Sequence, residues 1–112
     1  MMDNLDNLPS ASVEEIPEGA SVLDVREDFE WEAGHIDGAQ HIPLGQLPER
    51  YGEVAADEDV YVICRSGGRS LKATAYLQQY GFDPVNVRGG MGAWADAGRP
   101  MVSETGKTPT VR

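Results

Sequence analysis

The sequence has little cysteine and little histidine: Cys64 is the only thiol among 112 residues, and there are two histidines. One cysteine excludes an internal disulfide framework and is too few for a zinc cluster made by this chain alone. No apolar run approaches the ~18 residues of a membrane span, and the acidic N-terminus lacks the basic and apolar regions of a signal peptide. We therefore expect a protein of the reducing cytoplasm that has no metal site and no membrane partner.

Basic residues are scarce in the first half of the chain. Residues 1–63 contain 16 acidic and two basic residues, whereas residues 64–112 contain three acidic and seven basic ones. The formal net charge of −10 argues against nucleic acid as a partner. The half that contains Cys64 is nevertheless locally basic, with a net charge of +4, and this favours a small anionic substrate. The acidic half equally serves solubility, and the two interpretations are compatible.

Short apolar runs alternate with helical patterns along the chain, whose length suits one compact domain. The predicted strands are residues 21–26, 41–42, 60–63 and 85–87, and the predicted helices are residues 27–33, 44–51, 70–80 and 91–97. This alternation indicates an α/β fold in which helices cover both faces of a parallel sheet. We expect a loose leader at residues 1–10, the folded domain at residues 11–102 and a flexible polar tail at residues 103–112.

Cys64 directly follows the buried strand predicted at residues 60–63, and the sequence Arg-Ser-Gly-Gly-Arg separates it from a helix that opens at Ser70. We expect an exposed nucleophile here, because the helix N-terminus and the two arginines favour a thiolate over a thiol. Gly67 and Gly68 allow a tight curl whose N–H groups form an anion-binding nest. A lone cysteine is also common as a small buried hydrophobe, but the arginines and the double glycine favour the nucleophile.

Other polar residues are interpreted as structural. Asp24, Arg26 and Glu30 have the spacing of an ion pair that joins a strand to the following helix, and this interpretation outweighs acid–base chemistry. His35 lies in a tight Gly-His-Ile turn, where an isolated histidine is more typical of a structural hydrogen bond than of a metal ligand. Near the C-terminus, Gly90 and Gly92 are interpreted as turn residues rather than as part of a dinucleotide-binding motif.

Several separated motifs resemble the rhodanese-like domain family in its single-domain sulfurtransferase form. The resemblance spans about residues 12–100, and it implies a three-layer α/β/α fold with a central parallel sheet of about five strands. Its motifs are Leu23-Asp24-Val25-Arg26 followed by Glu30, the segment from Gly34 to Leu44, the segment from Val62 to Ser70, and Gly81-Phe82 with Arg88-Gly89-Gly90-Met91-Gly92-Ala93-Trp94.

The resemblance also implies a mechanism and its residues. Cys64 would take the outer sulfur from a small anionic donor such as thiosulfate and become a persulfide, and a thiol or cyanide would then accept that sulfur. No cofactor is implied. The residues implied to bind substrate and cradle the persulfide are Arg65, Ser66, Gly67, Gly68, Arg69 and Ser70, with Asp24, Arg26, Glu30 and His35 as structural support.

Loop length separates sulfur transfer from a related chemistry. Four residues lie between Cys64 and Arg69, whereas the related phosphatases and arsenate reductases of this fold have the longer C-x₅-R loop. A shorter loop suits a single sulfur atom better than a phosphate group. The alternative function is a non-enzymatic persulfide carrier, or a regulatory module of the same family, that works with a protein sulfur donor or acceptor.

Overall fold

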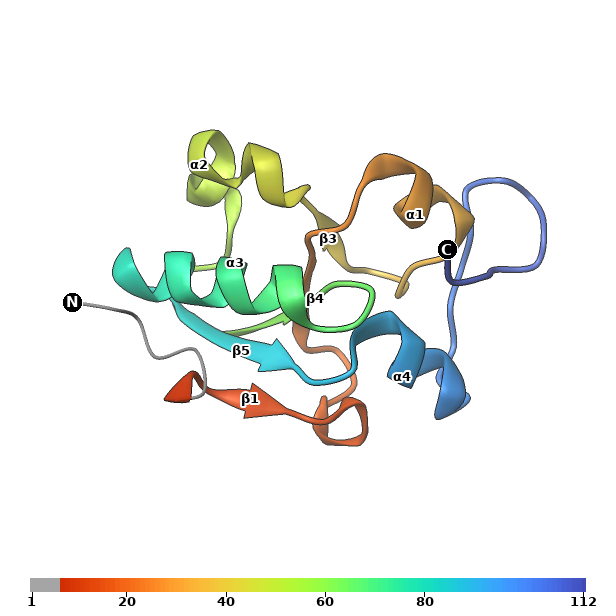
Figure 1. Ribbon diagram of the computed structural model, residues 1–112, viewed down its shortest axis with the longest axis horizontal. Coiled ribbons are helices and arrows are strands. Elements are labelled where there is room, and N and C mark those ends of the chain that lie inside the picture. Colours follow the sequence, from red (N-terminus) through yellow and green to blue (C-terminus); the bar gives the residue numbers. More distant parts are fainter. Residues whose placement is uncertain (1–6) are drawn as a thin grey trace.

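The computed structural model describes residues 7–112, so most of the expected leader lies outside the described residues. Five parallel strands form one sheet in the order β1-β5-β4-β2-β3 (Figure 1). The strands are β1 (Ser10–Ala11), β2 (Ser21–Asp24), β3 (Gln40–His41), β4 (Asp59–Ile63) and β5 (Asp83–Val87). The predicted α/β class with about five parallel strands is confirmed, and Ser10, which was assigned to the leader, belongs to the sheet.

Between and after these strands lie four α-helices and three short 3₁₀ turns. The helices are α1 (Asp28–Ala33), α2 (Leu47–Arg50), α3 (Gly68–Gln79) and α4 (Gly90–Asp96), and the turns are η2 (Val13–Glu15), η3 (Leu44–Gln46) and η4 (Tyr51–Glu53). The helical structure predicted at residues 44–51 is present, but it is divided into η3, α2 and η4 instead of forming one α-helix. Pro48 explains the break, since it has no N–H to donate to the carbonyl of Leu44.

Helix α3 begins at Gly68, two residues before the predicted start at Ser70. Gly67, with a φ of 131°, is its N-cap residue, so Arg69 and Ser70 lie within the first turn of the helix. The predicted end is close to the observed one, because Gly81 adopts a left-handed φ of 87° just after the helix. Within residues 7–112, no helix combines the length and the apolar character needed to cross a bilayer.

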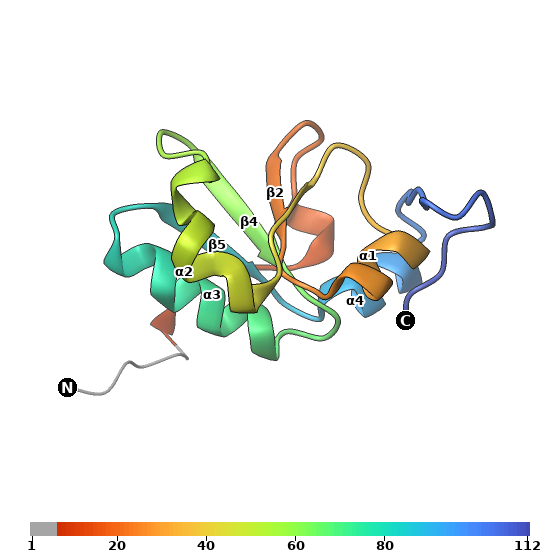
Figure 2. The ribbon, with the colours of Figure 1, turned by 90° about the horizontal axis from the view of Figure 1, so that it is seen from above.

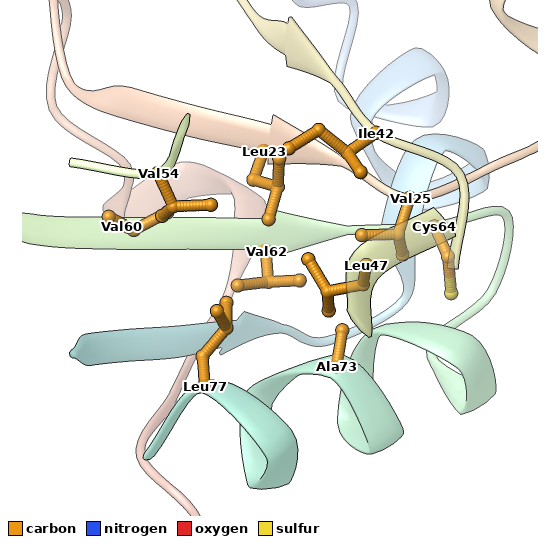
Figure 3. Packing of buried hydrophobic residues seen from close by; sticks show 10 residues of the cluster. All are labelled: Leu23, Val25, Ile42, Leu47, Val54, Val60, Val62, Cys64, Ala73 and Leu77. Carbon is orange, nitrogen blue, oxygen red and sulfur yellow. The ribbon is translucent and has the colours of Figure 1, made fainter. Parts of the chain in front are cut away.

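Alternation along β4 divides the core into two clusters, one on each face of the sheet. Val60 and Val62 face a cluster that includes Leu47 of α2 and Leu77 of α3 (Figure 3). Ile63 faces the opposite cluster, to which η2 and α4 contribute Val13, Met91 and Trp94. The helices thus form layers on both sides of the sheet, with α2 and α3 together on one side of it (Figure 2). This arrangement brings the carboxyl ends of the central strands to one edge, where β4 leads into α3.

The C-terminal segment, residues 103–112, returns to helix α1 (Figure 1). Its backbone donates two hydrogen bonds of 2.9 Å to that helix, from Glu104 to the carbonyl of Glu32 and from Thr110 to the carbonyl of Ala33. Val111 packs against the second core cluster. The flexibility expected for this segment stays a prediction. A flexible segment would have to break these two hydrogen bonds and the packing of Val111.

Deletion of residues 103–112 tests the importance of these contacts. We expect the free energy of unfolding to fall by about 1–3 kcal/mol, because two backbone hydrogen bonds and the packing of Val111 are lost. Urea denaturation of the full and shortened chains measures the difference. Equal midpoints would instead support the flexible tail that the sequence predicts.

Candidate active site

The loop after β4 is fixed at its base by helix α4. The carbonyl of Cys64 accepts a hydrogen bond of 2.8 Å from the N–H of Met91, and the carbonyl of Arg65 accepts one of 3.1 Å from the N–H of Gly92. These donors lie in the first turn of α4, where N–H groups have no partner inside the helix. The loop that contains the only cysteine is therefore held between two helix N-termini, those of α3 and α4.

The thiol of Cys64 faces the core beneath this loop rather than the solvent. Only 1% of the residue is exposed, and it belongs to the same cluster as Val62 and Leu77 (Figure 3). The expectation of an exposed nucleophile is therefore wrong for the loop in this conformation. Strand alternation gives the reason, because Cys64 continues the face on which Val60 and Val62 point toward α3.

Hydrogen bonds of the loop converge on the sulfur atom. The Sγ of Cys64 accepts a hydrogen bond of 3.0 Å from the N–H of Gly67 and lies 3.4 Å from the Oγ of Ser70. Burial raises the pKa of the Cys64 thiol, but hydrogen bonds from the Ser70 hydroxyl and from the N–H groups of Ser70, Gly67 and Ser66 outweigh it, so the pKa lies below its ordinary value. The causes that lower it are hydrogen bonds, whereas the sequence also suggested a contribution from the two arginines.

Ser70 connects the sulfur to strand β5. Its Oγ lies 2.6 Å from the Oδ1 of Asn86 and 3.0 Å from the carbonyl oxygen of Gly67, and both Ser70 and Asn86 are buried. A hydroxyl has one proton, so these acceptors compete with Cys64 for it. Asn86 was not predicted as a site residue. The available signal was a polar residue between the two valines of the strand predicted at residues 85–87.

The two glycines of the loop differ in their roles. Gly67 has a positive φ of 131°, which side chains rarely tolerate, and its N–H reaches the sulfur. Gly68 has no positive φ, and a methyl group placed on it would meet open space. The expected conformational need for glycine therefore applies to Gly67 alone. Arg65 and Ser66 are exposed at the start of the loop.

Arg69 forms an ion pair with Glu30. Its two terminal nitrogens lie 2.7 and 2.9 Å from the two carboxylate oxygens of Glu30, a bidentate arrangement that links α3 to α1. The hydrogen bond from Arg69 lowers the pKa of Glu30 despite partial burial, and Arg26 contributes to the lowering at longer range. The sequence predicted Arg69 as a ligand for the donor and Glu30 as a partner of Arg26, and it did not indicate this pair.

Arg26 and Asp24 form a second, fully buried ion pair below the loop. The Nη2 of Arg26 lies 2.6 Å from the Oδ2 of Asp24. The Nε of Arg26 also donates to the Asp24 carboxylate, Nη1 donates to the carbonyl of Glu30 at 3.3 Å, and Nη2 also donates to the carbonyl of Gly34 at 2.8 Å. Arg26 therefore joins β2 to α1 through backbone carbonyls, which fixes the helix that presents Glu30.

His35 lies away from the loop, between α1 and the C-terminal segment. Its ring stacks on Trp31 with centroids 3.6 Å apart, its Nδ1 lies 2.7 Å from the carbonyl of Trp31, and its Nε2 lies 3.3 Å from a carboxylate oxygen of Glu104. These contacts involve no residue of the loop. Among residues 7–112, no group of three or more His, Cys, Asp and Glu side chains is arranged to hold a metal ion.

Gly90 and Gly92 support the loop from α4, a role that the sequence did not reveal. A methyl group on Gly90 would overlap the carbonyl oxygen of Cys64, and one on Gly92 would lie 2.6 Å from a guanidinium nitrogen of Arg65. Their interpretation as turn residues is therefore incomplete, because both lie in the first turn of α4 and Gly90 permits the close approach of this helix to the loop backbone, whereas the Arg65 side chain could move away from a methyl group on Gly92. The repeated glycines after β5 were the signal, but close approach depends on the tertiary structure.

Comparison with known proteins gives consistent matches. A model of the rhodanese-like domain family matches residues 9–97. The chain is 42% identical over 90 residues to a protein named "Sulfurtransferase" from Allochromatium vinosum, with 80% of this chain and 84% of that protein covered. It is 38% identical over 99 residues to the "Putative sulfur carrier protein YrkF" of Bacillus subtilis, with 82% of this chain and 54% of that protein covered. Among solved structures, a rhodanese-related protein from Thermoplasma volcanium has a TM-score of 0.80 and 36% identity, covering 84% of this chain and 97% of that one.

The lowered pKa of Cys64 predicts alkylation by iodoacetamide at a lower pH than the ~8.5 midpoint of a free cysteine. Replacement Ser70→Ala removes a hydrogen bond to the sulfur and should raise the midpoint by roughly one pH unit, the scale of one hydrogen bond. The control Ser66→Ala should leave the midpoint unchanged, since Ser66 acts through its backbone N–H. Equal midpoints in all three proteins would contradict the role of the Ser70 hydroxyl.

Gly90→Ala tests the contact between α4 and the loop. Gly98→Ala is the matched control, because Gly98 also has a positive φ but open space around it. We expect Gly90→Ala to cost about 2 kcal/mol more than the control, since it adds overlap with the Cys64 carbonyl to a similar backbone strain. Thermal unfolding measures the stability of both variants. Equal losses of stability would show that backbone strain alone explains why glycine occupies position 90.

Proposed function

This chain belongs to the rhodanese-like domain family, and we propose that it is a sulfurtransferase that moves a sulfane sulfur through a persulfide on Cys64. The donor is thiosulfate or a similar small anion, and the acceptor is a thiol or cyanide. The observation that supports this proposal most strongly is the convergence of hydrogen bonds on the Cys64 sulfur. These bonds favour the thiolate, which is the nucleophilic form of cysteine.

The proposed reaction has two displacement steps at sulfur. The Cys64 thiolate attacks the outer sulfur of thiosulfate, a bond forms at Sγ, and the sulfur–sulfur bond of the donor breaks with its electron pair leaving on sulfite. The acceptor thiolate or cyanide then attacks the outer sulfur of the persulfide. The electron pair of the Sγ–S bond returns to Cys64, which regenerates the thiolate.

The remaining residues of the loop have proposed supporting roles. The N–H groups of Ser66, Gly67 and Ser70 stabilise negative charge on sulfur, as their effect on the Cys64 pKa indicates. Arg65 is exposed beside the cysteine and is the cation that an incoming anion meets first. Four residues between Cys64 and Arg69 form a compact loop, which suits a single transferred sulfur atom. We propose the cytoplasm as the location, where a free cysteine stays reduced.

A persulfide carrier that exchanges sulfur with a protein partner is the second candidate. Two observations favour it: the burial of Cys64 and the occupation of Arg69 by Glu30, both of which restrict a freely diffusing anionic donor. One relative is named as a sulfur carrier. A carrier would turn over thiosulfate slowly and exchange sulfur rapidly with a protein donor.

Intact-mass measurement of the reduced protein with thiosulfate tests the proposal. We expect a gain of one sulfur atom, about 32 Da, that cyanide removes as thiocyanate. Cys64→Ser should show no gain, because the chain has no other cysteine. No gain by the wild-type protein, with Cys64 still open to alkylation, would contradict thiosulfate as donor and favour the carrier. Transfer of sulfur by Cys64→Ser would refute the assignment of the nucleophile.

A further inference from the structure

Glu30 forms an ion pair with Arg69, the residue that the sequence predicts to bind the anionic end of a donor. Both of its carboxylate oxygens contact Arg69, at 2.7 and 2.9 Å, and both terminal nitrogens of the guanidinium take part. This is the bidentate geometry by which an arginine would bind a sulfonate or sulfite group. A donor that uses Arg69 must therefore compete with a carboxylate that already has the ideal geometry.

Of the two partners, Glu30 is the more firmly held. Its side chain is 7% exposed, whereas that of Arg69 is 33% exposed. The Oε1 of Glu30 also accepts a hydrogen bond of 2.9 Å from the N–H of Glu27, at the start of α1. Its backbone carbonyl accepts another from the buried Arg26. The negative charge of Glu30 thus stays beside the loop even when the Arg69 side chain moves.

Arg69 interacts electrostatically with Glu30 and with the reacting sulfur. The hydrogen bond to Glu30 raises the pKa of Arg69 most strongly, burial lowers it, and the charges of Glu30 and the Cys64 thiolate raise it further. Arg69 thus interacts electrostatically with both groups. A donor whose outer sulfur reaches Cys64 brings its own negative charge into the same region.

We infer that Glu30 is a specificity-determining residue that disfavours donors with two negative charges. The inference rests on the sulfur transfer proposed above and names the donor class within it. Each additional charge on the donor is repelled by Glu30, and Arg69, one of the two loop cations that could offset this repulsion, is already paired with it. Thiosulfate can still act as a donor, but the site favours donors whose outer sulfur is attached to an organic group of low charge. Glu30 acts by positioning Arg69 and by its charge, not by contact with the reacting atoms.

Two donors that differ by one charge provide the test. Thiosulfate is a dianion, and methanethiosulfonate replaces one of its oxygens with a methyl group, keeps the outer sulfur and is a monoanion. In Glu30→Gln we expect the ratio of kcat/KM for thiosulfate to kcat/KM for methanethiosulfonate to rise about fivefold or more, the effect of removing one nearby unit charge. The change should lie in the KM for thiosulfate rather than in kcat, because the thiolate keeps its hydrogen bonds.

Glu32→Gln is the matched control, because Glu32 is an exposed acid on the same helix and forms no ion pair with Arg69. In Glu32→Gln, the ratio of kcat/KM for thiosulfate to kcat/KM for methanethiosulfonate should stay at the wild-type value. An unchanged ratio in Glu30→Gln, or an equal rise in both variants, would overturn the inference. Glu30→Ala frees Arg69 by a second route, so a failure of Glu30→Gln to fold still leaves a decisive variant.

A binding measurement separates this inference from the proposed function. Sulfate is a dianion without a transferable sulfur, and its binding at the loop should protect Cys64 from iodoacetamide. Glu30→Gln should need about fivefold less sulfate for half-protection than the wild-type protein does. If the wild-type protein takes no sulfur from either donor, the proposed function fails, while the sulfate result still decides the effect of Glu30. Equal sulfate requirements would overturn the effect of Glu30 whether or not sulfur transfer occurs.

Discussion

The fold has to accommodate an ionisable sulfur atom at the end of a buried strand. Cys64 continues the apolar face of Val62, and burial there disfavours the thiolate. Hydrogen bonds from Gly67 and Ser70 take the place of water around the sulfur. Such bonds weaken steeply as the distance between donor and acceptor grows and as the bond departs from linearity, so the loop has to be fixed within a few tenths of an ångström. The N-termini of α3 and α4 provide this fixation, and the packing of both helices on the sheet is what the site depends on.

The charges around this sulfur are arranged as two linked ion pairs. Arg26 pairs with Asp24 and holds the backbone of α1, and α1 in turn presents Glu30 to Arg69. The basic second half of the chain thus has partners in the acidic first half, and Arg88 likewise lies near Glu15. Local net charge alone therefore overstates the attraction that the loop offers to an anion. The stabilisation of negative charge on Cys64 comes instead from N–H groups and one hydroxyl, whose combined effect outweighs burial and lowers the pKa.

Local features of the chain could be predicted from sequence, and contacts between distant segments could not. The strand before Cys64, the helix after it and the parallel sheet follow from apolar periodicity, which neighbouring residues determine. The start of α3 was misplaced because Gly67 and Gly68 have no side chains that signal a cap. The pair of Glu30 with Arg69 joins residues 39 positions apart, and the contact of Gly90 with the Cys64 carbonyl likewise depends on tertiary structure. The loop residues favour an exposed nucleophile over a buried cysteine, whereas strand alternation places Cys64 on the buried face of Val60 and Val62.

Ionisation of the nucleophile and selection of its substrate rest on different residues in this site. The pKa of Cys64 depends on its burial and on hydrogen bonds from the Ser70 hydroxyl and the N–H groups of Ser70, Gly67 and Ser66. The charge that a donor meets depends on Arg69 and Glu30, which lie on two helices and contact each other instead of the sulfur. A change at Glu30 therefore alters the charge beside the loop without removing a hydrogen bond from the thiolate. In the proposed reaction, this separation would let the response to donor charge change while the nucleophile stays activated, because the two requirements are met by separate contacts.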